Sequence, residues 1–345
     1  MTDGKIKKTS FGVLPDTQIH ALCDAGVISA QDGIEIDQVQ PASIDLRLGA
    51  KAYRMRASFL PGPEKSVRDY FDDDLVMHEL DLSKGAVLET GCVYMVPLKE
   101  ALRLPVGLSG AANPKSSTGR IDVFVRMITD GSDRFDAARE GYSGPLYVEI
   151  SPRTFSILAR EGDRLLQLRL RNGPKETIRD EIFSIDLKPG DDDIAGYRAK
   201  RHSRVLDLKN ISGHKIDDFW EPVRPYNGAL VLDPGEFYIL ASKEKVVIPV
   251  DEAAEMAPIA PEFGEFRAHY AGFFDPGFGV EGLEGKAVLE VRSREVPFIL
   301  TDGQPMGRLV FEPMVDKPRV PYGAAGSFAN YQGQGLKLSK HFGSK

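Results

Sequence analysis

The sequence predicts a mainly β protein built from two related domains. The first observation is alternation, because apolar residues recur at every second position in short runs at 123–125, 146–148 and 166–170, separated by Gly, Pro and Asp. Such runs are typical of an all-β sandwich or barrel. The second is length, since 345 residues exceed what one hydrophobic core usually serves. The third is an internal repeat.

The repeat relates residues 91–105 to residues 235–249 at an offset of 144. Five residues recur in register, Gly91 as Gly235, Tyr94 as Tyr238, Lys99 as Lys243, Glu100 as Glu244 and Pro105 as Pro249. Further on the offset is 141, which relates Glu149 to Glu290 and Gly162 to Gly303. We therefore expect one fold that was duplicated and fused.

The elements follow from local patterns. One of the few expected helices lies near residues 16–28, where Ile19, Leu22 and Cys23 share a face behind Asp16 as its cap. The alternating runs are the strands of each half. We expect Trp220, beside Phe219, to pack at a domain interface.

The domain boundaries are predicted from composition. Residues 57–82 and 172–226 are rich in charged and turn-forming residues. We predict an N-terminal domain over 1–175, a connecting segment over 176–226 that carries a few strands, and a C-terminal domain over 227–345.

The charge balance argues against some partners. Acidic residues outnumber basic ones by 51 to 44, and the sequence has no block of consecutive basic residues that stands out. We therefore expect no long nucleic-acid partner. A small anionic ligand needs only a local basic pocket. Residues 1–8 precede no apolar signal segment, and no later run could span a bilayer. We expect a cytoplasmic protein with no membrane partner.

The cysteines and histidines have no metal-binding spacing. Cys23 and Cys92 lie 69 positions apart, which fits neither a disulfide framework nor a zinc cluster, and we expect both to be buried. His202, His214 and His269 are expected to be structural or exposed.

The stretch Pro-Lys-Ser-Ser-Thr-Gly-Arg at 114–120 concentrates polar chemistry in an apolar region. Its hydroxyls and backbone amides can bind an anion while Lys115 and Arg120 neutralise the charge, and Gly119 allows close approach. The alternative is a polar turn that caps a short helix.

Other motifs occur in a fixed order around this stretch. They are Gln-Pro-Ala-Ser-Ile-Asp-Leu-Arg-Leu-Gly at 40–49, Phe-Asp-Pro-Gly-Phe at 274–278, Val-Leu-Glu at 288–290, Gly-Gln-Pro-Met-Gly-Arg-Leu-Val-Phe-Glu-Pro at 303–313, Pro-Tyr at 321–322 and Tyr-Gln-Gly-Gln-Gly at 331–335. The ordered set resembles the dCTP deaminase and dUTPase superfamily, and is most similar to the dCTP deaminases in a fused two-domain form. The resemblance covers most of the chain except residues 50–80 and 172–226. It implies a dUTPase-like β-barrel or jelly roll in each half.

The resemblance also implies residue roles. Ser116 and Arg120 correspond to residues that face the reacting base, and Ser117 to one that serves the phosphates. Glu149 or Glu290 resembles the family's general base, although both could instead be solvent-facing strand residues. Lys115 stands where the family usually has Arg, so looser phosphate contacts are expected.

Neither half keeps every motif. The second half has residues 258–266 where the Ser-Ser segment should be, and the first half lacks the Phe-Glu-Pro and Gly-rich segments and has an altered loop around Asp136. Since the resemblance implies homotrimers with sites between subunits, we hypothesise one site shared by the halves. It would bring together Ser116, Ser117 and Arg120 with Asp275, Glu290, Tyr322, Tyr331 and Gln334. Lys337 or Lys340 would supply the charge that Asn330 lacks.

The implied reaction is deamination of dCTP to dUTP and ammonia, which feeds dUTP and dTTP biosynthesis. It requires an activated water and a proton shuttle, roles that one carboxylate can serve, while Arg120 keeps that carboxylate ionised and Ser116 binds the exocyclic group. The signature of zinc deaminases is absent, so no zinc is expected, and Mg²⁺ is expected to bind mainly through the triphosphate. The alternatives are dUTP hydrolysis to dUMP and pyrophosphate, both steps in sequence, or a non-catalytic nucleotide sensor. A homo-oligomer is expected.

Overall fold

The computed structural model describes residues 11–343 apart from 72–73, 189–192, 261, 263–265, 270–271, 281 and 294, and only the backbone of 266–269. The described part is mainly β, as predicted. Its helices are short: α1 (Asp16–Asp24), α2 (Ser116–Gly119), α3 (Ile216–Phe219) and the 3-10 helices η1 (Ile36–Gln38) and η2 (Arg68–Tyr70).

The N-terminal half consists of two antiparallel sheets and a small third one. Its strands are β1 (Gly12–Val13), β2 (Ile28–Ala30), β3 (Val39–Gln40), β4 (Ser43–Leu46), β5 (Lys51–Met55), β6 (Val76–Asp81), β7 (Ala86–Leu88), β8 (Val93–Arg103), β9 (Leu108–Pro114), β10 (Val123–Thr129), β11 (Ala137–Ala138), β12 (Ser143–Pro152), β13 (Ile157–Ala159), β14 (Leu166–Asn172) and β17 (Leu206–Asp207). One sheet has the order β11-β9-β14-β4-β3 with β1 on β14, and the other has the order β10-β12-β8-β5-β6 with β2 on β8. The third is β17-β13-β7.

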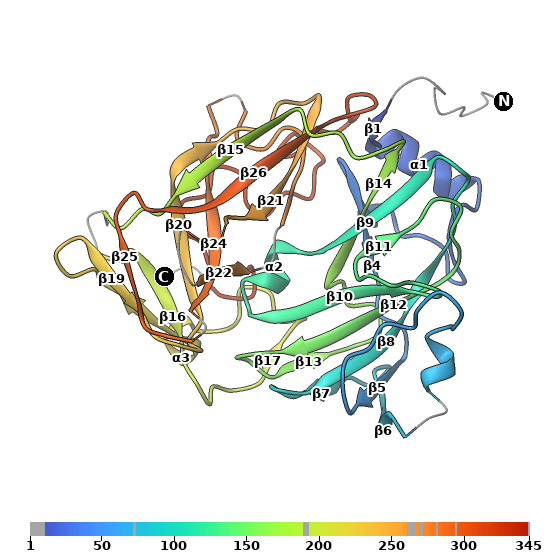
Figure 1. Ribbon diagram of the computed structural model, residues 1–345, viewed down its shortest axis with the longest axis horizontal. Coiled ribbons are helices and arrows are strands. Elements are labelled where there is room, and N and C mark those ends of the chain that lie inside the picture. Colours follow the sequence, from blue (N-terminus) through green and yellow to red (C-terminus); the bar gives the residue numbers. More distant parts are fainter. Residues whose placement is uncertain are drawn as a thin grey trace.

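The C-terminal half repeats this arrangement. Its strands are β15 (Arg179–Ser184), β16 (Gly196–Ala199), β18 (Trp220–Val223), β19 (Ala229–Leu232), β20 (Tyr238–Val246), β21 (Glu252–Pro258), β22 (Phe266–His269), β23 (Phe273–Phe274), β24 (Gly285–Ser293), β25 (Phe298–Thr301) and β26 (Pro305–Pro313). The sheets are β15-β26-β21-β23, β18-β16-β20-β24-β22 and the pair β19-β25. Figure 1 shows this half beside the N-terminal half, with α2 at the boundary.

The sequence repeat recurs as a repeat of strand register. The pairing of β8 with β12 matches the pairing of β20 with β24 at the same offsets. The hydroxyl of Tyr94 accepts a hydrogen bond from the amide of Glu89 at 3.0 Å, and the hydroxyl of Tyr238 accepts one from the amide of Asp233 at 3.0 Å. The shared strand register and the matching tyrosine hydrogen bonds are what a duplicated fold would show.

The predicted connecting segment, 176–226, is instead part of the folded halves. β15 pairs with β26, and β16 pairs with β20, where Tyr197 lies opposite Ile239 just as Tyr53 lies opposite Met95. These strands complete sheets that would otherwise lack their outer members, so the C-terminal domain begins near β15 and not at residue 227.

The first helix is shorter than predicted. α1 ends at Asp24 because Gly26 takes a left-handed conformation with φ 70°, and β2 then begins at Ile28. Pro15, not Asp16, is the capping residue. The Asp16 carboxylate instead accepts hydrogen bonds from the amides of Arg319 and Val320 at 2.8 and 3.1 Å.

The halves share one hydrophobic core across their boundary. Trp220 is fully buried, and its ring lies 5.3 Å from that of Phe155 and 5.8 Å from that of Phe342. The interface role predicted for Trp220 is therefore confirmed. Cys23 and Cys92 are only half-buried, because they lie at the edge of this core rather than within it.

Within the 57–82 segment, the described residues before β6 cover the outer face of the sheet that contains β12. A separate cluster there joins Tyr147 and Met95 to Val67, with Phe59 and Phe71 packed against it. Because alternate residues of a strand face the same side, Glu149 points toward this cover together with Tyr147. The corresponding face of β24, which includes Val288, packs against the N-terminal half.

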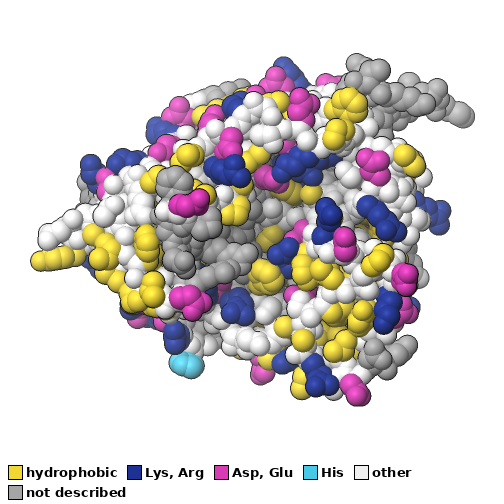
Figure 2. Space-filling view, in the orientation of Figure 1, with side chains coloured by type: hydrophobic (Ala, Val, Ile, Leu, Met, Phe, Trp, Pro, Cys, Tyr) yellow, Lys and Arg dark blue, Asp and Glu magenta, His cyan; other side chains and the backbone are white. Residues whose placement is uncertain are grey.

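Exposed apolar side chains gather on and beside the β19-β25 pair. Val231, Val296 and Ile299 are 49%, 52% and 61% exposed on and beside the β19-β25 pair, and Figure 2 shows hydrophobic side chains gathered there. Within the residues described, no helix has the length and apolar character that crossing a membrane would require.

Candidate active site

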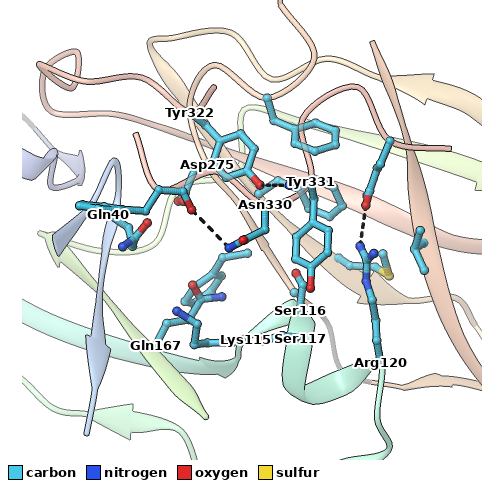
Figure 3. Close-up of a pocket in the computed structure, with 18 of the residues that line it drawn as sticks. Gln40, Lys115, Ser116, Ser117, Arg120, Gln167, Asp275, Tyr322, Asn330 and Tyr331 are labelled. Atoms are coloured by element: carbon cyan, nitrogen blue, oxygen red, sulfur yellow. Dashed lines mark hydrogen bonds between the residues drawn. The ribbon is translucent and has the colours of Figure 1, made fainter. Parts of the chain in front are cut away.

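A cavity of about 100 Å³ lies between the two halves. All the predicted site residues except Glu149 and Lys337 line it: Lys115, Ser116, Ser117, Arg120, Asp275, Glu290, Tyr322, Tyr331 and Gln334. Figure 3 shows Ser116, Ser117 and Arg120 on and beside α2, facing Tyr322 and Tyr331. Residues from the two halves, more than 140 positions apart in the chain, therefore line the same cavity.

One helical turn positions the Ser-Ser-Thr-Gly-Arg segment. The amides of Gly119 and Arg120 donate to the carbonyls of Lys115 and Ser116 at 3.0 and 3.1 Å. Residues four apart on a helical turn are neighbours on one face, so Ser116 and Arg120 approach the cavity together. Ser117 and Arg120 are buried.

The C-terminal segment, residues 314–343 after β26, holds the Arg120 guanidinium in place. Nη1 donates to the carbonyl of Lys337 at 2.8 Å, and Nη2 donates to Oε1 of Gln334 at 2.9 Å. The Tyr331 ring stacks on the guanidinium, with its centroid 4.0 Å from Cζ. Burial lowers the pKa of Arg120, and the nearby Tyr331 and Glu290 oppose that shift.

Glu290 is buried against the backbone of α2. A Cβ atom on Gly119 would lie 2.5 Å from both carboxylate oxygens of Glu290, so only glycine leaves room for the carboxylate. Burial raises the pKa of Glu290 well above its ordinary value, Arg120 lowers it, and Asp122 raises it. Burial thus favours the protonated form of this carboxyl group, and Arg120 favours its ionised form.

Asp275 forms another buried wall of the cavity. Its side chain is 10% exposed, and its Oδ1 has no hydrogen-bond partner in the described part of the protein. Burial raises its pKa to about 6, while Arg169 opposes and Asp45 supports that shift. Arg169 comes from the N-terminal half and donates to the carbonyl of Phe274 at 3.2 Å, which fixes the strand next to Asp275.

The C-terminal segment is fastened to both halves. The Tyr322 hydroxyl accepts a hydrogen bond from the amide of Tyr331 at 3.0 Å. Ser339 Oγ donates to the carbonyl of Ser117 at 2.8 Å. The segment therefore closes over α2 and completes the cavity.

A second cavity continues from the first past α2. The two share Lys115 and Ser117, and the second is also lined by Thr118, Arg164 and Lys340. Asp37 and Asp163 contribute carboxylates to its wall.

The cations of this region differ in their surroundings. Lys115 forms an ion pair with Asp45, so its charge is already partly neutralised. Burial, and then Lys115 and Arg164, lower the pKa of Lys340. Lys337 is exposed, and its Nζ donates to the carbonyl of Asn330 at 2.9 Å. Of the two lysines proposed to replace the missing charge, Lys340 therefore lines a cavity and Lys337 does not.

Comparison with known proteins agrees with this geometry. A model of the 2'-deoxycytidine 5'-triphosphate deaminase N-terminal domain matches residues 10–174, and a model of the C-terminal domain matches residues 159–342. The chain belongs to the dCTP deaminase family. The second match begins before residue 176, in agreement with the placement of 176–226 in the folded domains.

Individual relatives support the assignment. A crystal structure of 2'-deoxycytidine 5'-triphosphate deaminase from Agrobacterium tumefaciens is 51% identical, with a TM-score of 0.86, and covers 90% of this chain and 100% of its own. The dUMP-forming dCTP deaminase of Methanothermobacter thermautotrophicus is 29% identical over 54% of this chain and 89% of its own. The dCTP deaminase of Natronomonas pharaonis is 29% identical over 45% of this chain and 78% of its own.

Glu149 occupies a different place in this dCTP deaminase family fold. It is 3% exposed, and its Oε2 has no partner among the described residues. Burial raises its pKa, whereas Ser58 and Arg126 lower it. Ser58 belongs to the 57–82 cover, so that segment occupies the face that α2 would need to approach.

The strand register also shows which residue of the altered loop corresponds to Asp275. Strand register relates Ala138, opposite Gly110, to Phe274, opposite Ala254. The residue that corresponds to Asp275 is therefore Arg139 and not Asp136. Asp136 forms an ion pair with Arg126, 2.5 Å from Nε to Oδ2.

Among the residues that the structure describes, His202 and His214 do not share a site. His202 is exposed, and the ring of His214 lies 3.0 Å from the carbonyl of Asp207 through Nε2. The side chain of His269 lies outside the described residues. Across the part of the chain that is described, no three His, Cys, Asp or Glu side chains converge as metal ligands.

Sequence reasoning missed several cavity residues. Gln40, Asp45, Gln167 and Phe328 line the first cavity, and Arg164 lines the second. Gln40 and Asp45 belong to the motif at 40–49 that carried the family resemblance, so the signal was present but was not assigned to the site. Gln167 lies opposite Asp45 in the β14-β4 pair.

Proposed function

We propose that this protein hydrolyses dCTP to dUTP and ammonia at one site per chain, in the cavity between its halves, without zinc. The observation that carries the proposal is the contact between the two catalytic segments. Glu290 from the C-terminal half lies against Gly119 of the N-terminal half, in the cavity that Ser116 and Arg120 also line.

The side chains suit the steps that deamination requires. Ionised Glu290 takes a proton from the water whose oxygen attacks C4 of the cytosine ring, and gives that proton to the ring nitrogen N3. It then takes the proton of the new C4 hydroxyl and gives it to the amino group, so that the C4–N bond breaks and ammonia leaves. Its raised pKa makes this carboxylate a stronger proton acceptor than an ordinary glutamate. Arg120 supplies positive charge beside the carboxylate, and Ser116 can hydrogen-bond the exocyclic group.

The second cavity suits the triphosphate. Ser117 and Thr118 present hydroxyl groups, and the Thr118 hydroxyl lacks a hydrogen-bond partner among the residues described. Lys340 and Arg164 add positive charge. A phosphate chain that leaves the first cavity past α2 would enter this one and relieve the repulsion that lowers the pKa of Lys340.

The cavity also fits magnesium brought by the nucleotide. Asp45 Oδ1 and Asp275 Oδ1 are buried oxygens with no hydrogen-bond partner within the described ranges, and hard carboxylate oxygens are ligands that Mg²⁺ prefers. These residues would contact the bound ion, whose role is to neutralise phosphate charge.

A second candidate function is deamination followed by hydrolysis of dUTP to dUMP and pyrophosphate. The names of several relatives, including the Methanothermobacter protein, describe dUMP as the product. The free carboxylate oxygen of Asp275 lies in the same cavity and could orient a second water. The dUTP-forming activity remains the first proposal because the crystal structure that covers this chain at 51% identity is named only as a deaminase.

A chromatographic time course of the purified protein with dCTP and Mg²⁺ tests the proposal. Accumulation of dUTP supports a deaminase, and dUMP with pyrophosphate supports the two-step activity. Unchanged dCTP and no turnover of added dUTP would contradict both and favour a nucleotide sensor.

Homo-oligomerisation is also part of the proposal. The exposed apolar side chains on the β19-β25 pair offer a surface that a second copy could cover. Sedimentation at the assay concentration tests this, and an active monomer would show that one chain is sufficient.

A further inference from the structure

A buried ion pair outside the cavity joins the two catalytic segments. Asp122 lies two residues after Arg120, and Arg292 lies two residues after Glu290. Arg292 Nη2 donates to Asp122 Oδ2, across the boundary between the halves. The Asp122 and Arg292 side chains are 1% and 15% exposed, and neither lines the cavity.

The contacts of this pair are specific on both sides. Thr154 Oγ1 donates to Asp122 Oδ2 at 2.5 Å and accepts from Arg292 Nη2 at 3.1 Å. Arg292 Nη1 donates to the carbonyl of Gly235 on its own half. Asp122 takes a left-handed conformation with φ 54°, and its amide donates to the carbonyl of Gly119 at 2.9 Å. The carboxylate is therefore held by the backbone turn that directly follows α2.

Strand geometry connects the pair with the general base. Residues two apart on a strand point to the same face and lie about 7 Å apart, so Glu290 and Arg292 both face the N-terminal half. The repeat shows that this arrangement belongs to the cavity side alone, because the counterpart of Arg292 at the offset of 141 is Ser151, which cannot form an ion pair. On the corresponding face of β12, which carries Glu149 and Ser151, the 57–82 segment provides the cover, so no ion pair to the other half is needed there.

We propose that Asp122 and Arg292 form a positioning pair that locks the turn carrying Arg120 onto the strand carrying Glu290, and so holds the two catalytic side chains in register across the halves. This inference rests on the proposed function. The pair acts through Glu290 and Arg120 and does not itself touch the nucleotide.

Two other titratable groups lie near Glu290 and must be separated from this pair. They are Arg120 beside α2 and Tyr331 on the C-terminal segment. The backbone of His269 lies opposite that of Glu290 in the β22-β24 register. Asp122 differs from them because its negative charge raises the pKa of Glu290. Removing that charge should therefore move the acid limb of the activity profile to lower pH, whereas a loss of packing alone should not.

The test uses four variants of the full chain and a matched control. D122N keeps the shape and the left-handed turn, because Asn tolerates that conformation, R292M removes the cation, and R292K restores it. E312Q is the control, because Arg171 and Glu312 form another buried ion pair between the halves, with Nη2 to Oε1 at 2.7 Å, and neither residue lines the cavity. The fourth variant, H269Q, shows whether an acid-limb shift arises from His269.

The measurements are kcat, KM for dCTP, the pH profile of kcat/KM and the melting temperature. D122N and R292M should lower kcat about 10- to 100-fold, because a small misplacement of catalytic groups has effects of this size. D122N should also move the acid limb to lower pH, and R292K should recover most of the rate. E312Q should lower the melting temperature but keep the wild-type kcat and acid limb.

The contrary result is clear. If D122N and R292M match E312Q, with a lower melting temperature but unchanged kcat and acid limb, the pair is only structural and the inference fails. Turnover of dCTP by the wild-type protein, measured in the same assay, separates this failure from failure of the proposed function.

Discussion

Replacing Gly119 with alanine should separate catalysis from folding in this protein. The new Cβ would lie 2.5 Å from both Glu290 carboxylate oxygens, whereas ordinary contacts begin near 3.4 Å. The carboxylate must therefore move by about 1 Å, and a displacement of that size can lower kcat about 100-fold. The fold should tolerate the change, because the clashing atoms are the end of a side chain and alanine favours a helical turn by about 1 kcal/mol over glycine.

Steady-state deamination of dCTP, with a thermal melt of the same sample, measures both effects. The matched control is G335A, because a Cβ at Gly335 meets no atom within 4 Å. Gly335 is also close to the site, since it follows Gln334, which contacts Arg120. We expect G335A to behave as wild type and G119A to retain its melting temperature while losing kcat. A G119A variant with wild-type kcat would refute the view that Glu290 must sit against α2.

Three further predictions concern charge and cofactors. K340M should raise KM for dCTP about 10-fold with little change in kcat, because Lys340 would bind the phosphates equally in the ground and transition states, and an unchanged KM would remove Lys340 from the phosphate site. As pH falls through the raised pKa of Glu290, the base becomes protonated, so kcat/KM should fall along an acid limb well above pH 4.5, and a rate that stays flat to about pH 5 would contradict this role. Dialysis against a zinc-selective chelator at fixed Mg²⁺ should leave the rate unchanged, whereas removal of Mg²⁺ should lower the rate. If removing zinc abolished the activity, the zinc-free mechanism would be wrong.

Much of the fold could be predicted because core-facing strands leave a visible pattern. Strands such as Val123–Thr129 and Leu166–Asn172 alternate or repeat buried apolar residues, and the repeat fixes their partners. β15 was assigned to the connecting segment because it lies at a sheet edge, where half of the residues of Arg179–Ser184 are exposed and half are charged. The domain boundary was therefore placed too late.

Much of the site's residue set was predictable, but its contacts were not. The motifs indicated which residues of each half would meet, and the structure places them around one cavity. The sequence showed a glycine in a polar stretch, but it could not show that a carboxylate from the other half, Glu290, approaches Gly119. It also could not show that residues 57–82 cover Glu149, because an insertion without a repeat counterpart has no register to indicate its position.

The central claim is that one site per chain, based on Glu290, carries out deamination. The most direct test is the initial rate of dCTP deamination by E290Q and E149Q, each checked for a wild-type melting profile. We predict that E290Q loses nearly all activity and that E149Q keeps a rate close to wild type. Equal loss in both variants would contradict the single shared site.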